Sequence, residues 1–261
     1  MTDAQPSAGY FPCGLPYNRL GHGPRPLVVF QGLQFEKKPQ TGPLFQIYKF
    51  LGEEYTVYIV LRKPGMPQGY TMQNMANDYA VMIKEEFGGP VDVIGLSTGG
   101  SIAQHFAADH PDLVRRLVIH SSAYVLSDET KKLQLGVGRL AEQRQWAKAY
   151  AVLTEPFFPN KGGLKYLFRP IVWLVSVLMV FLEKPKDPSD LVVTVEAEDK
   201  HDFKDRLAEI KAPTLIVAGD KDPFYPETLF RQTAEGIPYA RLILYPGMGH
   251  SASGKQFDQM C

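Results

Sequence analysis

The sequence has few of the features that mark several large classes of protein. Among its 261 residues there are only two cysteines, Cys13 and Cys261, near opposite ends of the chain, so no disulfide framework can be inferred. Acidic and basic residues are equally numerous, 28 of each, and the net charge of zero lacks the positive excess that nucleic-acid binding requires. We therefore expect no nucleic-acid partner.

Segments that would direct the chain into a membrane are also missing from the sequence. Residues 1–9 have neither a basic start nor an apolar core and are not typical of a signal peptide. An uncharged, mainly apolar run at residues 170–182 is shorter than the roughly 20 residues that a membrane-spanning helix needs. These absences favour a cytoplasmic protein without stable insertion into a membrane.

A glycine-flanked serine is the most informative motif that is present. The pentapeptide Gly95–Gly99, with Ser97 at its centre, lies between an apolar run and a helix-like stretch. At such a strand-to-helix corner the turn is sharp, glycine avoids collisions at both flanks, and the serine hydroxyl is lifted clear of the sheet. The backbone N–H of Thr98 would point toward an oxyanion forming on a substrate. The motif therefore indicates a nucleophile elbow.

A serine nucleophile needs a base and an orienting acid, and the C-terminal third of the chain supplies both. The apolar run 213–218 is followed by Asp220 and Asp222, and the run 240–245 is followed by His250. This is the order Ser, Asp, His that the elbow implies. Because functional groups gather beyond the carboxyl ends of parallel strands, we expect these side chains to lie near the serine.

Together these motifs resemble the α/β-hydrolase superfamily, and the resemblance covers nearly the whole chain. Its segments are Leu27–Phe30 with Gln31-Gly32 after it, Arg62–Gly65, the elbow, the spacing of Gly219, Asp222 and Pro226, and Gly249-His250. The resemblance implies that Ser97 is the nucleophile, His250 the general base and then acid, and Asp222 the orienting carboxylate. It also implies a closing helix after His250 that is longer than the eleven residues found here.

One position departs from the pattern of that family. Its members often have His-Gly after the third strand, where this chain has Gln31-Gly32. The resemblance implies an oxyanion hole formed by the backbone N–H groups of Leu33 and Thr98, which a glutamine need not abolish. We expect Gln31 and Gly32 beside the substrate, with the glutamine changing how the loop is braced.

The order of elements along the chain predicts the fold class. Strand-like and helix-like segments alternate, among them a strand at 55–61 and an amphipathic helix at 72–87, which argues for an α/β fold with a mostly parallel central sheet flanked by helices. Between residues 122 and 200 the alternation stops and helical patterns take over. The resemblance implies a helical cap there. We expect a hydrolase core at 1–121 and 201–261 with the cap, 122–200, inserted into it.

The uncharged run at 170–182 is the most unusual segment of the expected cap. A helix that is apolar on all sides is commonly buried, so the run either packs within the cap or, in addition, lines an apolar acyl or aromatic pocket above Ser97. Trp173, Val177 and Leu178 are then candidate substrate-binding residues. Contact with lipid at a membrane surface is a third, minor alternative.

Other titratable residues are weaker candidates for the same roles. Asp220 competes with Asp222 as the acid, although the spacing to Pro226 favours Asp222, and Asp128 is a more distant alternative. Of the other histidines, His22, His105 and His110 fit loop, packing or helix-end positions, and His120 and His201 show no metal-ligand spacing. We expect neither a metal nor a cofactor.

We predict a serine esterase of the carboxylesterase kind whose substrate is a small apolar ester. Ser97 would attack the ester carbonyl, His250 would take its proton, and water would release the acid from an acyl-enzyme. Lactonase, thioesterase, acyltransferase, perhydrolase and carbon–carbon bond hydrolase chemistry use a similar triad and stay open. A slow-turnover, receptor-like binding protein is the alternative from another class. Substrate identity and oligomeric state do not follow from the sequence.

Overall fold

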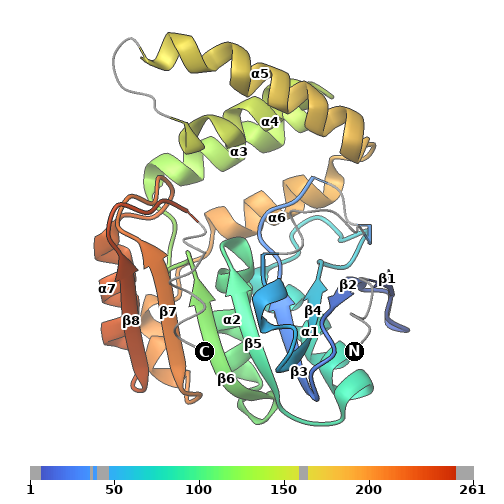
Figure 1. The fold of residues 1–261 in the computed structure, drawn as a ribbon, viewed down its shortest axis with the longest axis vertical. Coiled ribbons are helices and arrows are strands. Elements are labelled where there is room, and N and C mark those ends of the chain that lie inside the picture. The colour runs from blue at the N-terminus through green and yellow to red at the C-terminus, as the bar shows by residue number, and fades with distance from the viewer. Residues whose placement is uncertain (1–6, 36–37, 40–46, 159–163, 251–261) are drawn as a thin grey trace.

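An eight-stranded sheet organises the fold (Figure 1). The computed structural model describes residues 7–35, 38–39, 47–158 and 164–250. Cys261 and the other residues that follow His250 lie outside the described residues, as does most of the N-terminal segment 1–9. The longer closing helix that the resemblance implies therefore stays a prediction.

The sheet is mostly parallel, as the sequence predicts. Its strands are β1 (Ser7–Tyr10), β2 (Pro16–Leu20), β3 (Arg25–Phe30), β4 (Tyr55–Val60), β5 (Val91–Leu96), β6 (Val114–His120), β7 (Thr214–Gly219) and β8 (Ala240–Tyr245). They lie in the order β1-β2-β4-β3-β5-β6-β7-β8. The pairs β1–β2 and β2–β4 are antiparallel, and the remaining neighbours are parallel.

The register of the parallel strands brings their carboxyl ends to one edge of the sheet. Phe30 of β3 pairs with Gly95 of β5, and Leu96 pairs with His120 of β6. The chain therefore leaves the sheet at Ser97 on the same edge as the loop that begins with Gln31. The loops after β7 and β8 leave at this edge as well (Figure 1).

Hydrophobic residues on both faces of the sheet are covered, as expected for strands buried on two sides. Helices α1 (Met72–Phe87), α2 (Thr98–Asp109) and α7 (Glu227–Gly236) share one core with alternate strand residues such as Val28 and Phe30. Leu27 and Val29 point the opposite way and pack with Leu51 of the short 3-10 helix η2 (Lys49–Leu51).

Local sequence explains the ends of α1, which the sequence predicts at the observed bounds. The Thr71 hydroxyl accepts a hydrogen bond from the Asn74 backbone N–H, and the Asn74 side chain accepts one from the Thr71 N–H, so two otherwise unpaired groups are satisfied. Gly88 ends the helix at a φ of 65°, a left-handed conformation that glycine adopts without steric cost.

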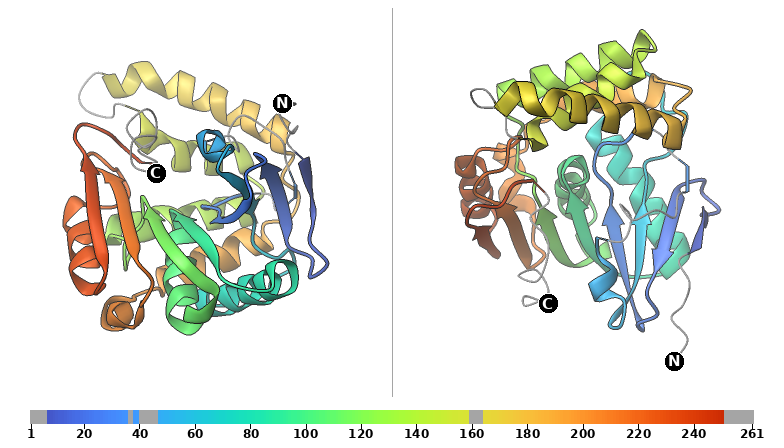
Figure 2. Two further views of the ribbon diagram at one scale, coloured as in Figure 1. Left: turned by 60° about the horizontal axis from the view of Figure 1, so that its bottom comes forward. Right: turned by 45° about the horizontal axis from the view of Figure 1, so that its top comes forward.

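Four further helices form a separate layer, which we call the helical layer. They are α3 (Asp128–Glu142), α4 (Trp146–Thr154), α5 (Leu164–Glu183) and α6 (Ser189–Asp199). The layer lies over the carboxyl edge of the sheet (Figures 1 and 2), and in the view of Figure 1 α6 is next to that edge and α5 is farthest from it. Within the described residues, no helix combines the length and apolar character needed to cross a membrane.

Candidate active site

The elbow places Ser97 in a strained conformation between β5 and α2. Its backbone has a φ of 51° and a ψ of −123°, which costs a non-glycine residue roughly 1–3 kcal/mol. At Gly95 and Gly99, which flank the serine, there is no room for a side chain. A Cβ at Gly99 would lie 1.9 Å from the Phe30 carbonyl oxygen, and one at Gly95 would lie 2.6 Å from the Gly100 Cα. The elbow is therefore held by close backbone approach on both sides.

Asp222 and His250 form a buried pair. The Nδ1 atom of His250 lies 2.7 Å from Oδ2 of Asp222, and the two side chains are 8% and 0% exposed. The other carboxylate oxygen accepts hydrogen bonds from the backbone N–H groups of Phe224 and Tyr225, at 2.8 and 3.2 Å. A carboxylate held in this way favours the tautomer that carries its proton on Nδ1, which leaves Nε2 of His250 as a base.

The two alternative acids lie elsewhere. Asp220 accepts a hydrogen bond from the Gly247 N–H at 2.7 Å and so supports the loop that carries His250. Asp128 is the first residue of α3 and is not among the residues that line the pocket at Ser97. Of the three carboxylates considered, Asp222 is the one that contacts the histidine.

A cavity of about 190 Å³ is lined by Ser97 and His250, with Asp222 behind the histidine. It is lined by Gln31, Gly32, Leu33, Leu96, Ser97, Gln134, Leu153, Phe157, Phe224, Tyr225 and His250. The ring centroid of His250 lies 4.8 Å from that of Phe224 and 6.0 Å from that of Phe157. Aromatic rings therefore surround the histidine and limit its contact with water.

A buried arginine braces the loop after β3. The guanidinium of Arg62 donates to the carbonyl oxygens of Gln31, at 2.8 Å, and Gly32, at 2.9 Å. The Gln31 side chain accepts from the Gly32 N–H at 3.3 Å. Burial lowers the pKa of Arg62, while the negative charges of Glu198 and Asp190 are among the influences that raise it. The bracing that the sequence left open thus comes from Arg62 as well as from the glutamine.

A buried acid on α6 reaches the elbow helix and was missed from the sequence. The carboxyl oxygens of Glu198 accept hydrogen bonds from the hydroxyls of Thr98, at 2.7 Å, and Ser101, at 3.1 Å. Complete burial raises the pKa of Glu198, and the hydrogen bonds from these hydroxyls act in the opposite direction. Its spacing from the buried residues Leu191 and Thr194 on the same helix was the available signal.

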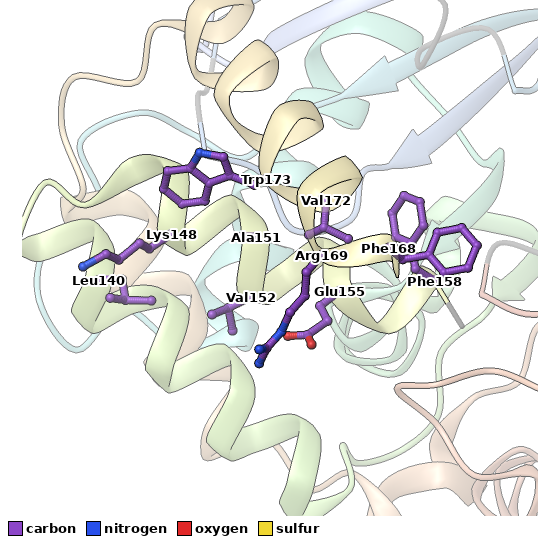
Figure 3. Close-up of a pocket in the computed structure, with 10 residues that line it drawn as sticks. All are labelled: Leu140, Lys148, Ala151, Val152, Glu155, Phe158, Phe168, Arg169, Val172 and Trp173. Atoms are coloured by element: carbon purple, nitrogen blue, oxygen red, sulfur yellow. The ribbon is translucent and has the colours of Figure 1, made fainter. Parts of the chain in front are cut away.

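The structure does not bring the three predicted residues of α5 to the pocket at Ser97. Val177 and Leu178 are exposed to solvent. Trp173 lines a different cavity, of about 450 Å³, between α3, α4 and α5 (Figure 3). That cavity is mainly apolar and carries Lys148, Glu155 and Arg169 on its wall. In the pocket at Ser97, Gln134, Leu153 and Phe157 are the residues contributed by the helical layer and the turn after α4.

The other histidines have structural surroundings. His120 is buried, with Nδ1 2.8 Å from the Tyr48 hydroxyl, and His110 contacts Asn77. The rings of His105 and His201 lie 5.4 Å apart, and burial lowers their pKa values to about 4 and about 3. No cluster of three or more potential metal ligands occurs in the part of the chain that the structure describes.

Comparison with known proteins bears on the family and the fold of the chain. Residues 6–258 match the alpha/beta hydrolase family. Pimeloyl-acyl-carrier-protein methyl ester esterase of Neisseria meningitidis is 27% identical over 165 residues, or 62% of this chain and 52% of that protein, so the match spans about half of the relative. Among solved structures, the alpha/beta hydrolase MGS-M2 from a deep-sea metagenome library has a TM-score of 0.78 at 18% identity, covering 97% of this chain and 95% of that one. An esterase from Exiguobacterium antarcticum has a TM-score of 0.70 at 20% identity, covering 97% and 96%. At these identities the structures share the fold.

Proposed function

Because the chain belongs to the α/β-hydrolase family, we propose that this hydrolase cleaves a carboxylic ester with Ser97 as its nucleophile. The observation that carries the proposal is the buried Asp222–His250 pair, whose histidine lines the same cavity as the strained serine. A nucleophile, a base and a residue that orients the base are the parts that acyl transfer needs.

The proposed reaction follows from the positions of these groups. Nε2 of His250 takes the Ser97 proton as the hydroxyl oxygen attacks the ester carbonyl, and Asp222 stabilises the imidazolium. The N–H groups of Thr98 and Leu33 hold the oxyanion. The imidazolium then gives its proton to the departing alcohol, which leaves an acyl-enzyme. Water, deprotonated by the same histidine, releases the acid and restores the serine.

The lining of the cavity supports a small, mainly apolar acyl or aromatic group. Leu33, Leu96, Leu153, Phe157 and Phe224 all contribute to its wall. A cavity of about 190 Å³ that is walled by such side chains favours a compact apolar substrate, since each buried methylene contributes about 0.8 kcal/mol. The proposal needs no cofactor.

We also propose that residues 122–200 act as a cap on a core made of residues 1–121 and 201–261. The position of the helical layer over the carboxyl edge supports this division (Figure 1). The turn after α4 places Phe157 in the wall of the pocket that contains Ser97. The layer therefore contributes side chains to substrate binding through α3, α4 and that turn rather than through α5.

Covalent labelling tests the proposal. A fluorophosphonate should label Ser97, and Ser97→Ala should lose on the order of 10⁴- to 10⁶-fold in rate toward p-nitrophenyl esters while its thermal melt is retained. Peptide mass spectrometry that places the label on another serine would refute the nucleophile. A burst of about one turnover followed by a stall would instead favour the receptor-like alternative.

A further inference from the structure

The wall of the cavity at Ser97 includes a buried polar group without a partner. Gln134 of α3 is 5% exposed and lines this cavity together with Ser97 and His250. Among the described residues, none donates a hydrogen bond to its amide oxygen, Oε1. An acceptor that is buried and unpaired lowers folding stability, so its presence in a cavity that binds substrate points to a donor on the substrate.

A second glutamine of the same cavity does have partners. Oε1 of Gln31 accepts a hydrogen bond from the Gly32 N–H at 3.3 Å, and the backbone carbonyl of Gln31 accepts one from Arg62. Gln31 is therefore used to brace the loop after β3. The Gln134 oxygen has no such structural contact in the part of the chain that the structure describes.

The contacts of α3 fix the position of Gln134. The residue belongs to the buried face of the helix, which also includes Thr130 and Val137. One turn before Gln134, the Thr130 hydroxyl donates to the Phe224 carbonyl oxygen at 2.6 Å. The ring centroid of Phe224 lies 4.8 Å from that of His250. The buried face of α3 is thus fastened beside the proposed base, and Gln134 cannot turn toward solvent.

The nitrogen end of the Gln134 amide has a different role. Burial is the largest influence on the pKa of Glu198 and raises it, and a hydrogen bond from the Gln134 side chain is among the influences that lower it. An ionised carboxylate can only accept hydrogen bonds, so the N–H end of the amide is the one that meets Glu198. Oε1 is the end that is left for another molecule.

The other side chains that the helical layer adds to the cavity are apolar. They are Leu153 and Phe157, which offer no hydrogen-bond donor to Gln134. An acyl chain made only of methylene groups would displace water from Oε1 without replacing its hydrogen bond, which is costly. A hydroxyl is a compact donor that suits a cavity of about 190 Å³.

We propose that Gln134 selects an acyl group that carries a hydroxyl, by accepting a hydrogen bond from that hydroxyl at Oε1. This inference rests on the proposed function, because it names the substrate class of the same site as esters of small hydroxy acids. Gln134 transfers no proton and sets specificity alone. An acyl group with a methyl in place of the hydroxyl leaves the amide oxygen unpaired, and buried polar sites discriminate strongly against such a substitute.

Matched esters test the proposal. In p-nitrophenyl 3-hydroxybutanoate and 3-methylbutanoate a hydroxyl replaces a methyl, as it does in 2-hydroxypropanoate and 2-methylpropanoate. The wild-type enzyme should have the higher kcat/KM for the hydroxy ester of at least one pair. Gln134→Leu, which has no acceptor, should shift that preference about tenfold toward the methyl analogue. Gln134→Met, which keeps the length of the side chain, should give a similar shift.

The matched control is Leu153→Ala, which removes apolar contact from the same wall. It should change kcat/KM for both esters of a pair alike and leave their ratio unchanged. Thermal melts confirm that each variant is folded. Equal wild-type rates for the two esters of each pair, or a preference that survives both Gln134 substitutions, would overturn the proposal.

A binding measurement separates this inference from the proposed function. Ser97→Ala should not form an acyl-enzyme, so calorimetric titration of this variant with the methyl esters of the same acids compares affinities without turnover. Adding Gln134→Leu should shift the ratio of the two dissociation constants about tenfold. Preferred binding of the hydroxy ester without any hydrolysis by the wild type would refute the proposed function and support this inference. Hydrolysis without a preference for the hydroxy ester in either assay would overturn this inference alone, and the absence of both hydrolysis and preferential binding would overturn both.

Discussion

At the scale of single residues, the proposed chemistry depends on Asp222, whose two carboxylate oxygens have different partners. One oxygen contacts His250, and the other is held by backbone N–H groups of the following turn. Asp220, two positions earlier, is held by a backbone N–H of the histidine loop instead. Similar residues at neighbouring positions thus support different parts of the same site.

We expect Asp222→Asn to lower kcat on the order of 10⁴-fold, because the amide favours the wrong histidine tautomer and leaves the imidazolium unpaired. Asp220→Asn should cost much less, since an amide oxygen can still accept from the Gly247 N–H. Steady-state rates of the two variants toward one p-nitrophenyl ester provide the comparison. Equal, mild losses would mean that the Asp222–His250 pair is not used in the reaction.

We expect Phe157, and not α5, to determine which acyl-chain lengths the enzyme prefers. Phe157 lines the pocket and lies against His250, whereas Leu178 is similarly exposed on the outer face of α5. Phe157→Ala should lower kcat/KM about tenfold for hexanoate esters and less for acetate, because apolar contact with the acyl chain is lost. Leu178→Ala should leave the ratio of kcat/KM for hexanoate esters to kcat/KM for acetate unchanged. A change in this ratio in the Leu178 variant would indicate that α5 does contribute to the substrate pocket.

At the scale of elements, the link between α6 and α2 joins the helical layer to the nucleophile. Glu198 holds two hydroxyls of the first turns of α2, one of them from the residue whose N–H is proposed to bind the oxyanion. Asp190, at the other end of α6, accepts from the backbone N–H groups of Gly65 and Met66. The helix is therefore fastened to the core at both ends by carboxylates.

Glu198→Ala should lower the free energy of unfolding by about 2–3 kcal/mol, because it leaves a cavity and two buried hydroxyls without their acceptor. It should also lower kcat between about 10- and 100-fold with a smaller change in KM, as expected when an oxyanion donor is displaced. Glu198→Gln should lose less of both, since an amide resembles the neutral acid that burial favours. The control is Glu196→Gln, at a partly exposed position of the same helix. Wild-type rates in Glu198→Ala would show that the link does not position the elbow.

At the scale of the whole molecule, buried histidines make the folding stability depend on pH. His201 is buried beside His105, with Lys131 adding to the positive field, and burial lowers the pKa of His201 to about 3. In the unfolded chain the same imidazole titrates near 6.5. The unfolded state therefore binds more protons below that pH, and folding stability falls as the pH is lowered.

We expect the free energy of unfolding to decrease between pH 6.5 and pH 4 by up to about 1.4 kcal/mol per pH unit for His201 alone. Urea melts at a series of pH values measure this slope. His201→Phe, which keeps an aromatic ring without a titrating group, should flatten it. His22→Gln, at an exposed loop position, should not change it. An unchanged slope in His201→Phe would show that the buried imidazole is not the source.

Features that depend on neighbours in the chain could be predicted from the sequence alone. The elbow, the α1 helix and the mostly parallel sheet follow from glycine spacing, capping residues and the alternation of strands and helices, all of which act over a few residues. The expected acid and histidine were also found together, because parallel strands deliver their carboxyl ends to one edge. The catalytic roles of Ser97, Asp222 and His250 stay predictions that rest on this geometry.

Only the tertiary structure decided which faces meet. An apolar run such as 170–182 does not encode which of its sides is covered, so the sequence could not exclude Val177 and Leu178 from the pocket. Arg62 and Glu198 reach the site because strands and helices far apart in the chain pack together, and a buried charge is recognised only when its partners are in place. The chemistry of the elbow is thus local in origin, whereas its bracing and the outer face of α5 arise from packing between distant segments.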